Sequence, residues 1–295
     1  MDTKKIVKAG EIASETKRYA RTIIKKGTPL VEIAEKIESK IIELGGKPAF
    51  PTNLSIDNVA AHFTPTHDDK TLAHGLIKVD FGVHIDGWTA DNAFSVDLED
   101  SDLNKKLIKA SEDALDSALE LVKKNKGKSV LGELGKTIQD TIESKGFHPV
   151  INLCGHSMEK YELHGGLMIP NVDDRRKTEL EEGLYAIEPF ATSGKGRVHD
   201  GEPSGIYELV SEKLPRSPLA REVMAFVIKE YDKLPFCSRW IVKKLGTRAL
   251  FGLRELESLG ILHQFSQLVE SHGTKVSQAE QTILIEKDKV TVTTI

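Results

Sequence analysis

The chain has 295 residues, enough for one large domain or two ordinary ones with a stable core in either case. Its formal net charge of -4 gives no electrostatic reason to expect nucleic acid or an anionic membrane as the main partner. No apolar run approaches the roughly 20 residues of a membrane span, and two cysteines, Cys154 and Cys237, provide neither a disulfide framework nor a paired metal motif.

The N-terminal segment predicts two successive helices. Residues 1–20 have a helical pattern with charges throughout and lack the apolar centre of a signal peptide, so we expect the protein to stay in the cytoplasm. After a break, residues 25–48 continue as a second amphipathic helix that ends before Pro48.

Residues 79–94, VDFGVHIDGWTADNAF, predict two strands that fold back at Asp86-Gly87, a pair with a strong turn preference. With a two-residue turn, position 82 opposes Asp91 and position 80 opposes 93, so Asp80 and Asp91 share one face. A four-residue turn would place the two acids directly opposite each other, again on one face. Burying two unpaired carboxylates this close costs several kcal/mol, which a bound cation would remove. Alternatively, one aspartate is solvated or bonded to backbone amides.

The second part of the chain repeats the order of the first. Four pairs of short features recur about a hundred residues apart: KAGE (8–11) and KASE (109–112), Pro48 and Pro149, His62 and His164, and GLIKVD (75–80) and GLYAIE (183–188). Each match is weak alone, but the preserved order is hard to produce by chance. We therefore predict an α/β (α+β) fold in which a unit of two helices followed by strands is duplicated about an approximate two-fold axis. In this repeat, Glu188 takes the place of Asp80.

Two further segments contain candidate ligands. NLCGHSMEKYELHGG (152–166) holds His156 and His164, and the C-terminal residues alternate as a strand pair that turns at 287–288, with Glu280 before the turn. Considered alone, such a histidine is more commonly a hydrogen-bonded loop residue, and such a glutamate an exposed strand residue.

Residues 205–265 have no counterpart in the first half. Three stretches in this segment have amphipathic helical patterns. We expect a packed helical insertion subdomain over 205–265, beside a catalytic domain formed by 1–204 and 266–295.

Six ordered motifs resemble those of the methionine aminopeptidases: NVAAHFTP (58–65), KVDFG (78–82), ADNAF (90–94), GHSMEKYELHGG (155–166), YAIEPF (185–190) and QAEQTILI (278–285). The resemblance covers essentially the whole chain. In its length and in the position of its insertion, the chain resembles the short archaeal form of the type II branch. The resemblance implies the pita-bread fold, a two-fold duplicated α/β architecture that agrees with the repeat.

The resemblance also implies a site with two divalent metal ions. Five residues match the family's ligands: Asp91 and Glu280 would bridge both ions, Asp80 would complete one site, and His156 with Glu188 would complete the other. Four carboxylates and one imidazole suit Mn, Fe, Co or Zn, and the sequence does not choose among them.

The implied activity is hydrolysis of the first peptide bond of nascent proteins, which removes the initiator methionine before a small second residue. Glu188 would also move a proton, His62 and His164 would contact the substrate, and Phe50, Leu163 and Phe190 match positions that line the methionine pocket. A buried aromatic residue is more often plain core. We expect the protein to be a monomer whose partners are the N-termini of nascent chains, and to be transiently close to the ribosome.

Three positions depart from the family pattern. Ala279 and Gln281 flank the last ligand where the family usually has an aromatic residue and a histidine, and Phe265 stands where many type II enzymes have tyrosine. These changes alter the surroundings of the site without removing a ligand.

The sequence disfavours three alternatives to this function. Xaa-Pro peptidases share the fold but usually carry an additional N-terminal domain, for which the first repeat leaves no space. Non-catalytic binding relatives lose metal ligands that this chain keeps. A Cys154/His156 nucleophile pair lacks an orienting partner and an evident oxyanion site.

Overall fold

The computed structural model describes residues 1–295, and each half of the duplicated core begins with a helix pair. In the first half these are α1 (Thr3–Ile23) and α2 (Leu30–Glu43), and in the second half α3 (Asp102–Lys124) and α4 (Leu131–Ser144). Gly27 and Gly127 lie in the two equivalent turns with φ of +83° and +84°, a left-handed conformation that favours glycine. The predicted duplication of a helix pair is confirmed.

The strands of the first half form a four-stranded antiparallel sheet. β4 (Leu76–Ile85) pairs along its length with β5 (Trp88–Asp97). Its other edge pairs with β1 (Lys47–Pro48) and β2 (Asn53–Ile56).

The β4–β5 hairpin has the predicted two-residue turn. Ile85 pairs with Trp88, and Asp86 and Gly87 both have positive φ, 49° and 83°, as a type I′ turn requires. Gly82 therefore pairs with Asp91 and Asp80 pairs with Ala93, so the two acids are diagonal neighbours on one face. The alternative four-residue turn is excluded.

The second half forms a five-stranded and a three-stranded sheet, both antiparallel. The strand order of the five-stranded sheet is β16 (Lys289–Val292), β15 (Gln281–Glu286), β9 (Gly183–Ile187), β7 (Cys154–Met158) and β8 (Met168–Pro170). The strand order of the three-stranded sheet is β14 (Val276–Gln278), β10 (Phe190–Thr192) and β6 (His148–Pro149). The predicted C-terminal strand pair is confirmed, because Glu286 pairs with Lys289 across the turn.

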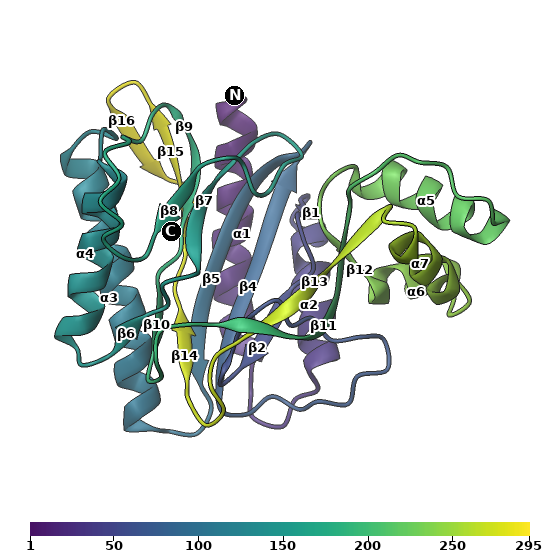
Figure 1. Ribbon diagram of the computed structural model, residues 1–295, viewed down its shortest axis with the longest axis horizontal. Coiled ribbons are helices and arrows are strands. Elements are labelled where there is room, and N and C mark those ends of the chain that lie inside the picture. The colour runs from purple at the N-terminus through teal and green to yellow at the C-terminus, as the bar shows by residue number, and fades with distance from the viewer.

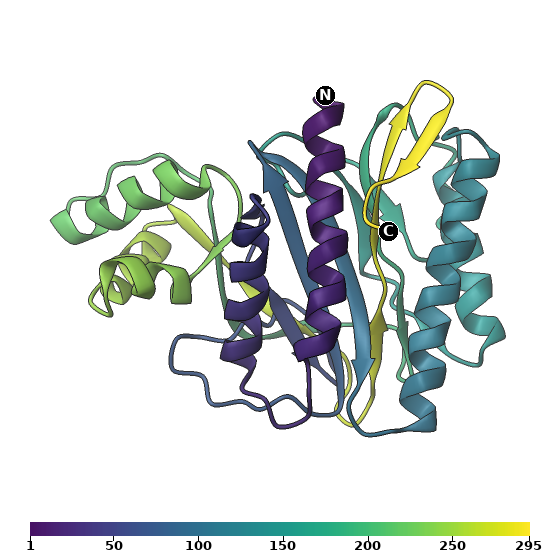
Figure 2. The same cartoon turned by 180° about the vertical axis from the view of Figure 1, so that it is seen from behind.

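The four long helices flank the sheets in two pairs. In Figure 2, α1 and α2 run across the front of the strands, and α3 and α4 stand at their edge, whereas Figure 1 shows the opposite side, on which β10, β11 and β14 lie. Each helix pair has its own apolar core: 18 buried residues join α1 and α2 to β4 and β5, and 22 join α3 and α4 mainly to strands of the second half. No helix is long and apolar enough to cross a membrane.

The helical insertion projects from one end of the sheets (Figure 1). It contains α5 (Pro218–Tyr231), β12 (Phe236–Cys237), α6 (Ser238–Leu245) and α7 (Ala249–Ser258), and a separate cluster of 12 buried hydrophobic residues holds it together. Two long paired strands, β11 (His199–Leu209) and β13 (Leu262–Val269), join it to the core, where β13 pairs with β3 (Val59–Ala61). The expected boundaries at 205 and 265 fall inside these strands, so the division into subdomains stays a prediction.

Candidate metal centre

One cavity between the two halves brings together all the expected metal ligands and substrate contacts. Its volume is about 80 Å³, and its lining includes the five expected ligands and the five expected substrate contacts: Asp80, Asp91, His156, Glu188, Glu280, Phe50, His62, Leu163, His164 and Phe190. The acids come from strands of both halves and from the C-terminal segment, which explains why no single stretch of sequence contains the site.

Three of the expected ligands converge most closely. One ligand atom from each of Asp91, His156 and Glu280 lies within 4.8 Å of the others. His156 Nε2 is 3.6 Å from Asp91 Oδ2 and 3.9 Å from Glu188 Oε1. Asp80 and Glu188 lie outside this tight group but line the same cavity.

The four carboxyl groups are difficult to ionise together. Burial raises the pKa of Asp80 to about 7. Burial also raises the pKa values of Asp91, Glu188 and Glu280 well above the ordinary range, and repulsion from the neighbouring carboxylates raises each of them further. A cavity with four such acids stores unfavourable electrostatic energy that a cation would relieve.

The residues present fit divalent metal ions. Asp80 Oδ1 is buried and has no hydrogen-bond partner, which leaves it free as a ligand atom. Burial lowers the pKa of His156 to about 3, so its imidazole is neutral near pH 7 and can coordinate. Carboxylate oxygens with one imidazole nitrogen are donors suited to Mn, Fe, Co or Zn.

These shifts predict that metal binding releases protons and tightens as the pH rises. Carboxyl groups with raised pKa values still hold protons near pH 7, whereas metal ions bind the ionised form. Calorimetric titration of the metal-free protein with Mn²⁺ should therefore show an affinity that rises up to about tenfold per pH unit for each proton released. The part of the proton release that comes from Asp80 should fall as the pH passes about 7. An affinity that does not change between about pH 6 and pH 8 would contradict the shifted pKa values.

The raised pKa values of the carboxyl groups also determine how the stability of the metal-free protein changes with pH. Because the folded-state pKa of each carboxyl lies above its unfolded value, the metal-free fold gains most from these groups where they are protonated. Their contribution is lost as the pH rises through the folded-state pKa, about 7 for Asp80. Bound metal should reverse this trend.

Two histidines lie beside the acids. His62 follows β3 with φ +64°, and its ring packs edge-on against Phe265 with centroids 5.4 Å apart. Its Nδ1 is 3.3 Å from the carbonyl oxygen of Ser266, which can only accept, so Nδ1 carries the proton. The ring of His164 lies 4.6 Å from that of His156 between centroids and is open to solvent on one side. Burial lowers the pKa of His62 to about 4.

The apolar part of the cavity uses more residues than the sequence indicated. Phe50, Leu163 and Phe190 are all buried. The strands that lead into and out of the insertion add apolar walls that the repeat could not reveal, because they have no counterpart in the first half: Ile206, Phe265, Leu268 and, from the loop before β12, Pro235. Among the departures, Ala279 packs in the core of the second half and Phe265 contacts His62.

Two polar residues of the site were missed. Asn53 lines the cavity opposite Asp80 in the sheet, and its Oδ1 is buried without a partner. Gln278 is buried between Asp80 and Glu188. Its position two residues before Glu280 was the available signal, because alternate residues of an extended segment share a face.

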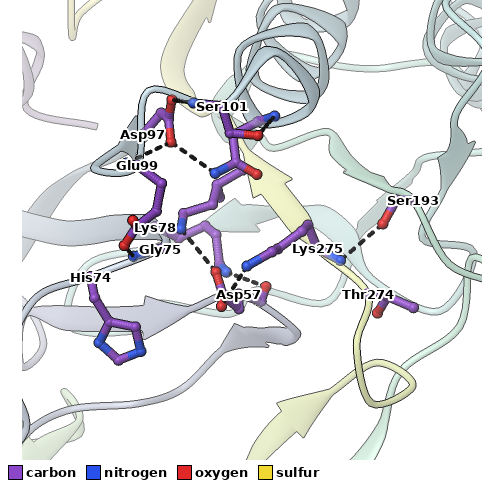
Figure 3. A network of polar contacts seen from close by, with 12 residues as sticks. Asp57, His74, Gly75, Lys78, Asp97, Glu99, Ser101, Ser193, Thr274 and Lys275 are labelled. Carbon is purple, nitrogen blue, oxygen red and sulfur yellow. Dashed lines mark hydrogen bonds and ion pairs between the residues drawn. The ribbon is translucent and has the colours of Figure 1, made fainter.

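A polar network fixes the start of β14 relative to β4 (Figure 3). The Asp57 carbonyl accepts hydrogen bonds from Lys78 Nζ at 2.7 Å and from the Val276 amide at 3.0 Å. Its carboxylate pairs with Lys275, with Oδ2 and Nζ 2.6 Å apart. Lys78 is fully buried two residues before Asp80, so the network holds strands from both halves in register beside the acids.

The cysteine alternative has no support in the structure. Burial raises the pKa of Cys154 to about 11, so its thiol is not a ready nucleophile near pH 7.

Comparison with known proteins identifies the class of protein to which the chain belongs. The model of metallopeptidase family M24 matches residues 4–227. A thermophilic Arx1 superposes with a TM-score of 0.83 at 15% identity over 98% of this chain and 90% of that chain. A methionine aminopeptidase from Thermotoga maritima superposes with a TM-score of 0.70 at 21% identity, over 100% and 98% of the two chains. The protein is therefore a metallopeptidase with the pita-bread fold.

Sequence similarity is more specific than the fold. The methionine aminopeptidase of Pyrococcus horikoshii is 45% identical over 299 residues, covering 100% of both chains. This chain belongs to the methionine aminopeptidase family, as its motifs predicted.

Proposed function

We propose that this chain removes the initiator methionine from newly made proteins by metal-dependent hydrolysis of their first peptide bond. The observation that carries the proposal is the convergence of four buried acids and His156 on one cavity, with His62 and His164 beside them. Membership of the methionine aminopeptidase family supports the same reaction.

The proposed cofactor is a pair of divalent ions. Asp91 and Glu280 would bridge them, Asp80 would complete one site, and His156 with Glu188 would complete the other. His156 Nε2 and Glu188 Oε1 lie 3.9 Å apart, which supports placing these two residues at one site. Bound ions would polarise the scissile carbonyl and lower the pKa of a bound water molecule.

The side chains would supply proton transfer and orientation. Glu188 would move a proton from water to the leaving amine, because its carboxylate lines the cavity and can accept a proton and then donate it. The neutral His62 ring donates through Nδ1, so Nε2 is left to accept a hydrogen bond from a substrate N–H. His164, at the solvent side of the cavity, would bind the peptide beyond the scissile bond.

The apolar walls would select the first residue. Phe50, Leu163 and Phe190 are the proposed contacts for the methionine side chain, and Phe265 and Leu268 close the cavity from the insertion side. An unbranched thioether suits such an irregular apolar space. The small second residue, a monomeric state, transient ribosome proximity and a cytoplasmic location stay predictions.

The proposal predicts rapid hydrolysis of Met-Ala-Ser and none, or far less, of Ala-Pro. Metal-free protein would be reconstituted separately with Mn²⁺, Fe²⁺, Co²⁺ and Zn²⁺, and free methionine would be measured. Chelation should abolish turnover, and added metal should restore it. A preference for Ala-Pro would favour the Xaa-Pro peptidases instead, and no turnover with any of these metals would favour a binding role.

A further inference from the structure

Gln278 connects carboxylates that belong to the two different halves of the fold. Its side chain is 1% exposed, and its Nε2 lies 3.2 Å from Asp80 Oδ2 and 3.3 Å from Glu188 Oε2. An amide nitrogen carries two hydrogens, so it can donate one to each carboxylate at the same time.

The backbone of Gln278 is held on both sides. Its amide donates to Ser95 Oγ at 2.9 Å, and Ser95 Oγ donates to its carbonyl oxygen at 2.8 Å. On the other side, β14 pairs with β10, in which Gln278 stands opposite Phe190. The backbone contacts and the burial of the side chain together hold the amide nitrogen in place relative to the two carboxylates.

The two bonds leave one oxygen of each carboxylate unused. Asp80 Oδ1 is buried without a partner, and Glu188 Oε1 is the oxygen that faces His156, 3.9 Å from Nε2. We propose that Gln278 is a positioning residue, which holds one oxygen of Asp80 and one of Glu188 so that the remaining oxygen of each faces a metal ion. This inference rests on the proposed metal site.

A neutral donor is the group that this position needs. A carboxylate here would add a fifth negative charge, and an ammonium group would compete with the metal ions for the same oxygens. The lysine closest in sequence to Asp80 is the buried Lys78, and its Nζ donates instead to the Asp57 carbonyl (Figure 3). Because the amide carries no charge, it orients the carboxylates without neutralising them.

The test is the replacement Gln278→Met, which keeps the length of the side chain and removes both donors. We expect Mn²⁺ binding to the metal-free protein, measured by calorimetry, to weaken roughly 10- to 100-fold. The visible absorption spectrum of the Co²⁺ protein should also change, because freed carboxylates can turn and alter the coordination. The Tm of the metal-free variant should stay close to that of the wild type.

A matched control is Gln139→Met. Gln139 Nε2 also donates to a carboxylate, Glu143 Oε1 at 2.9 Å, but on the exposed face of α4. This variant should bind Mn²⁺ like the wild type. Gln278→Leu provides a second variant if Gln278→Met folds poorly.

Two results would overturn the inference. If a folded Gln278 variant keeps both wild-type Mn²⁺ affinity and the wild-type Co²⁺ spectrum, the amide does not position the ligands, while the proposed function stands. If the wild-type protein itself binds no divalent metal, the metal site fails and the role of Gln278 fails with it.

Discussion

Asp91→Ala is expected to abolish hydrolysis of Met-Ala-Ser and to weaken metal binding. Asp91 has a ligand atom within 4.8 Å of those of His156 and Glu280, and it is the proposed bridge between two ions. Loss of a bridging carboxylate removes several kcal/mol of transition-state stabilisation, which corresponds to a fall in kcat/KM on the order of 10³-fold or more. The measurements are turnover at saturating Mn²⁺ and calorimetry of Mn²⁺ binding.

The same replacement should lower the Tm of the metal-free protein much less than its effect on activity would suggest. Burial and repulsion from Asp80 raise the pKa of Asp91, so its ionised form is unfavourable at neutral pH, and its removal relieves that repulsion. Asp91→Asn keeps the shape of the side chain and should lose activity to a similar degree. Activity lost with Tm preserved would therefore separate a metal role from a structural one.

Asp86→Asn is the control in the same hairpin. Asp86 stands at the turn, where its exposed carboxylate pairs with Lys5 Nζ at 2.8 Å, and it does not line the cavity. Exposed pairs of this kind contribute little, so activity and Mn²⁺ affinity should both stay near the wild-type values. Turnover retained by Asp91→Ala would rule out the bridging role.

The features predicted from sequence were those with local or periodic signals. The Asp86-Gly87 turn set the register of β4 and β5, and therefore the shared face of Asp80 and Asp91. The ordered repeats revealed the duplicated helix pairs. Once Asp80 was placed, its counterpart Glu188 followed from symmetry, and both line the same cavity.

Features that depend on distant contacts were not predictable in this way. The two oxygens that Gln278 binds belong to residues 198 and 90 positions away, and no local pattern indicates such a meeting. The walls contributed by Ile206 and Pro235 come from residues 205–265, the segment that breaks the repeat. The burial of Lys78 was not predictable either, because lysine is rarely fully buried and its partner, the Asp57 carbonyl, lies 21 residues away.

The attachment of the insertion is a third long-range feature. Arg239, in α6, donates through Nη1 and Nη2 to the two carboxylate oxygens of Glu38, in α2, at 2.8 Å each, across 201 residues. Trp240 Nε1 and the Thr52 amide donate to the same carboxylate, at 2.8 and 3.2 Å. Arg239 Nε also donates to the Pro65 carbonyl at 3.1 Å, so the pair joins the insertion to two loops of the core.

Glu38→Ala should cause the largest loss of stability among the replacements considered. Glu38 and Arg239 are only 6% and 2% exposed, so removal of the carboxylate leaves a guanidinium charge buried without a counter-charge. Breaking a buried pair from one side costs roughly 3–5 kcal/mol. In somewhat smaller domains, Tm falls by about 2–4 °C for each kcal/mol lost from the free energy of unfolding. The expected fall in Tm is therefore on the order of 10 °C. Calorimetric or circular-dichroism melting would measure it.

Glu35→Ala is the matched control, one turn earlier on the same helix. Glu35 pairs with Lys243 of the same α6 at 3.3 Å, but both side chains are largely exposed. Such a pair is worth about 1 kcal/mol or less, so Tm should change little. The double variant Glu38→Leu/Arg239→Met should recover much of the stability lost by Glu38→Ala, because it leaves no buried charge. Equal losses for Glu38→Ala and Glu35→Ala would show that the buried pair does not anchor the insertion.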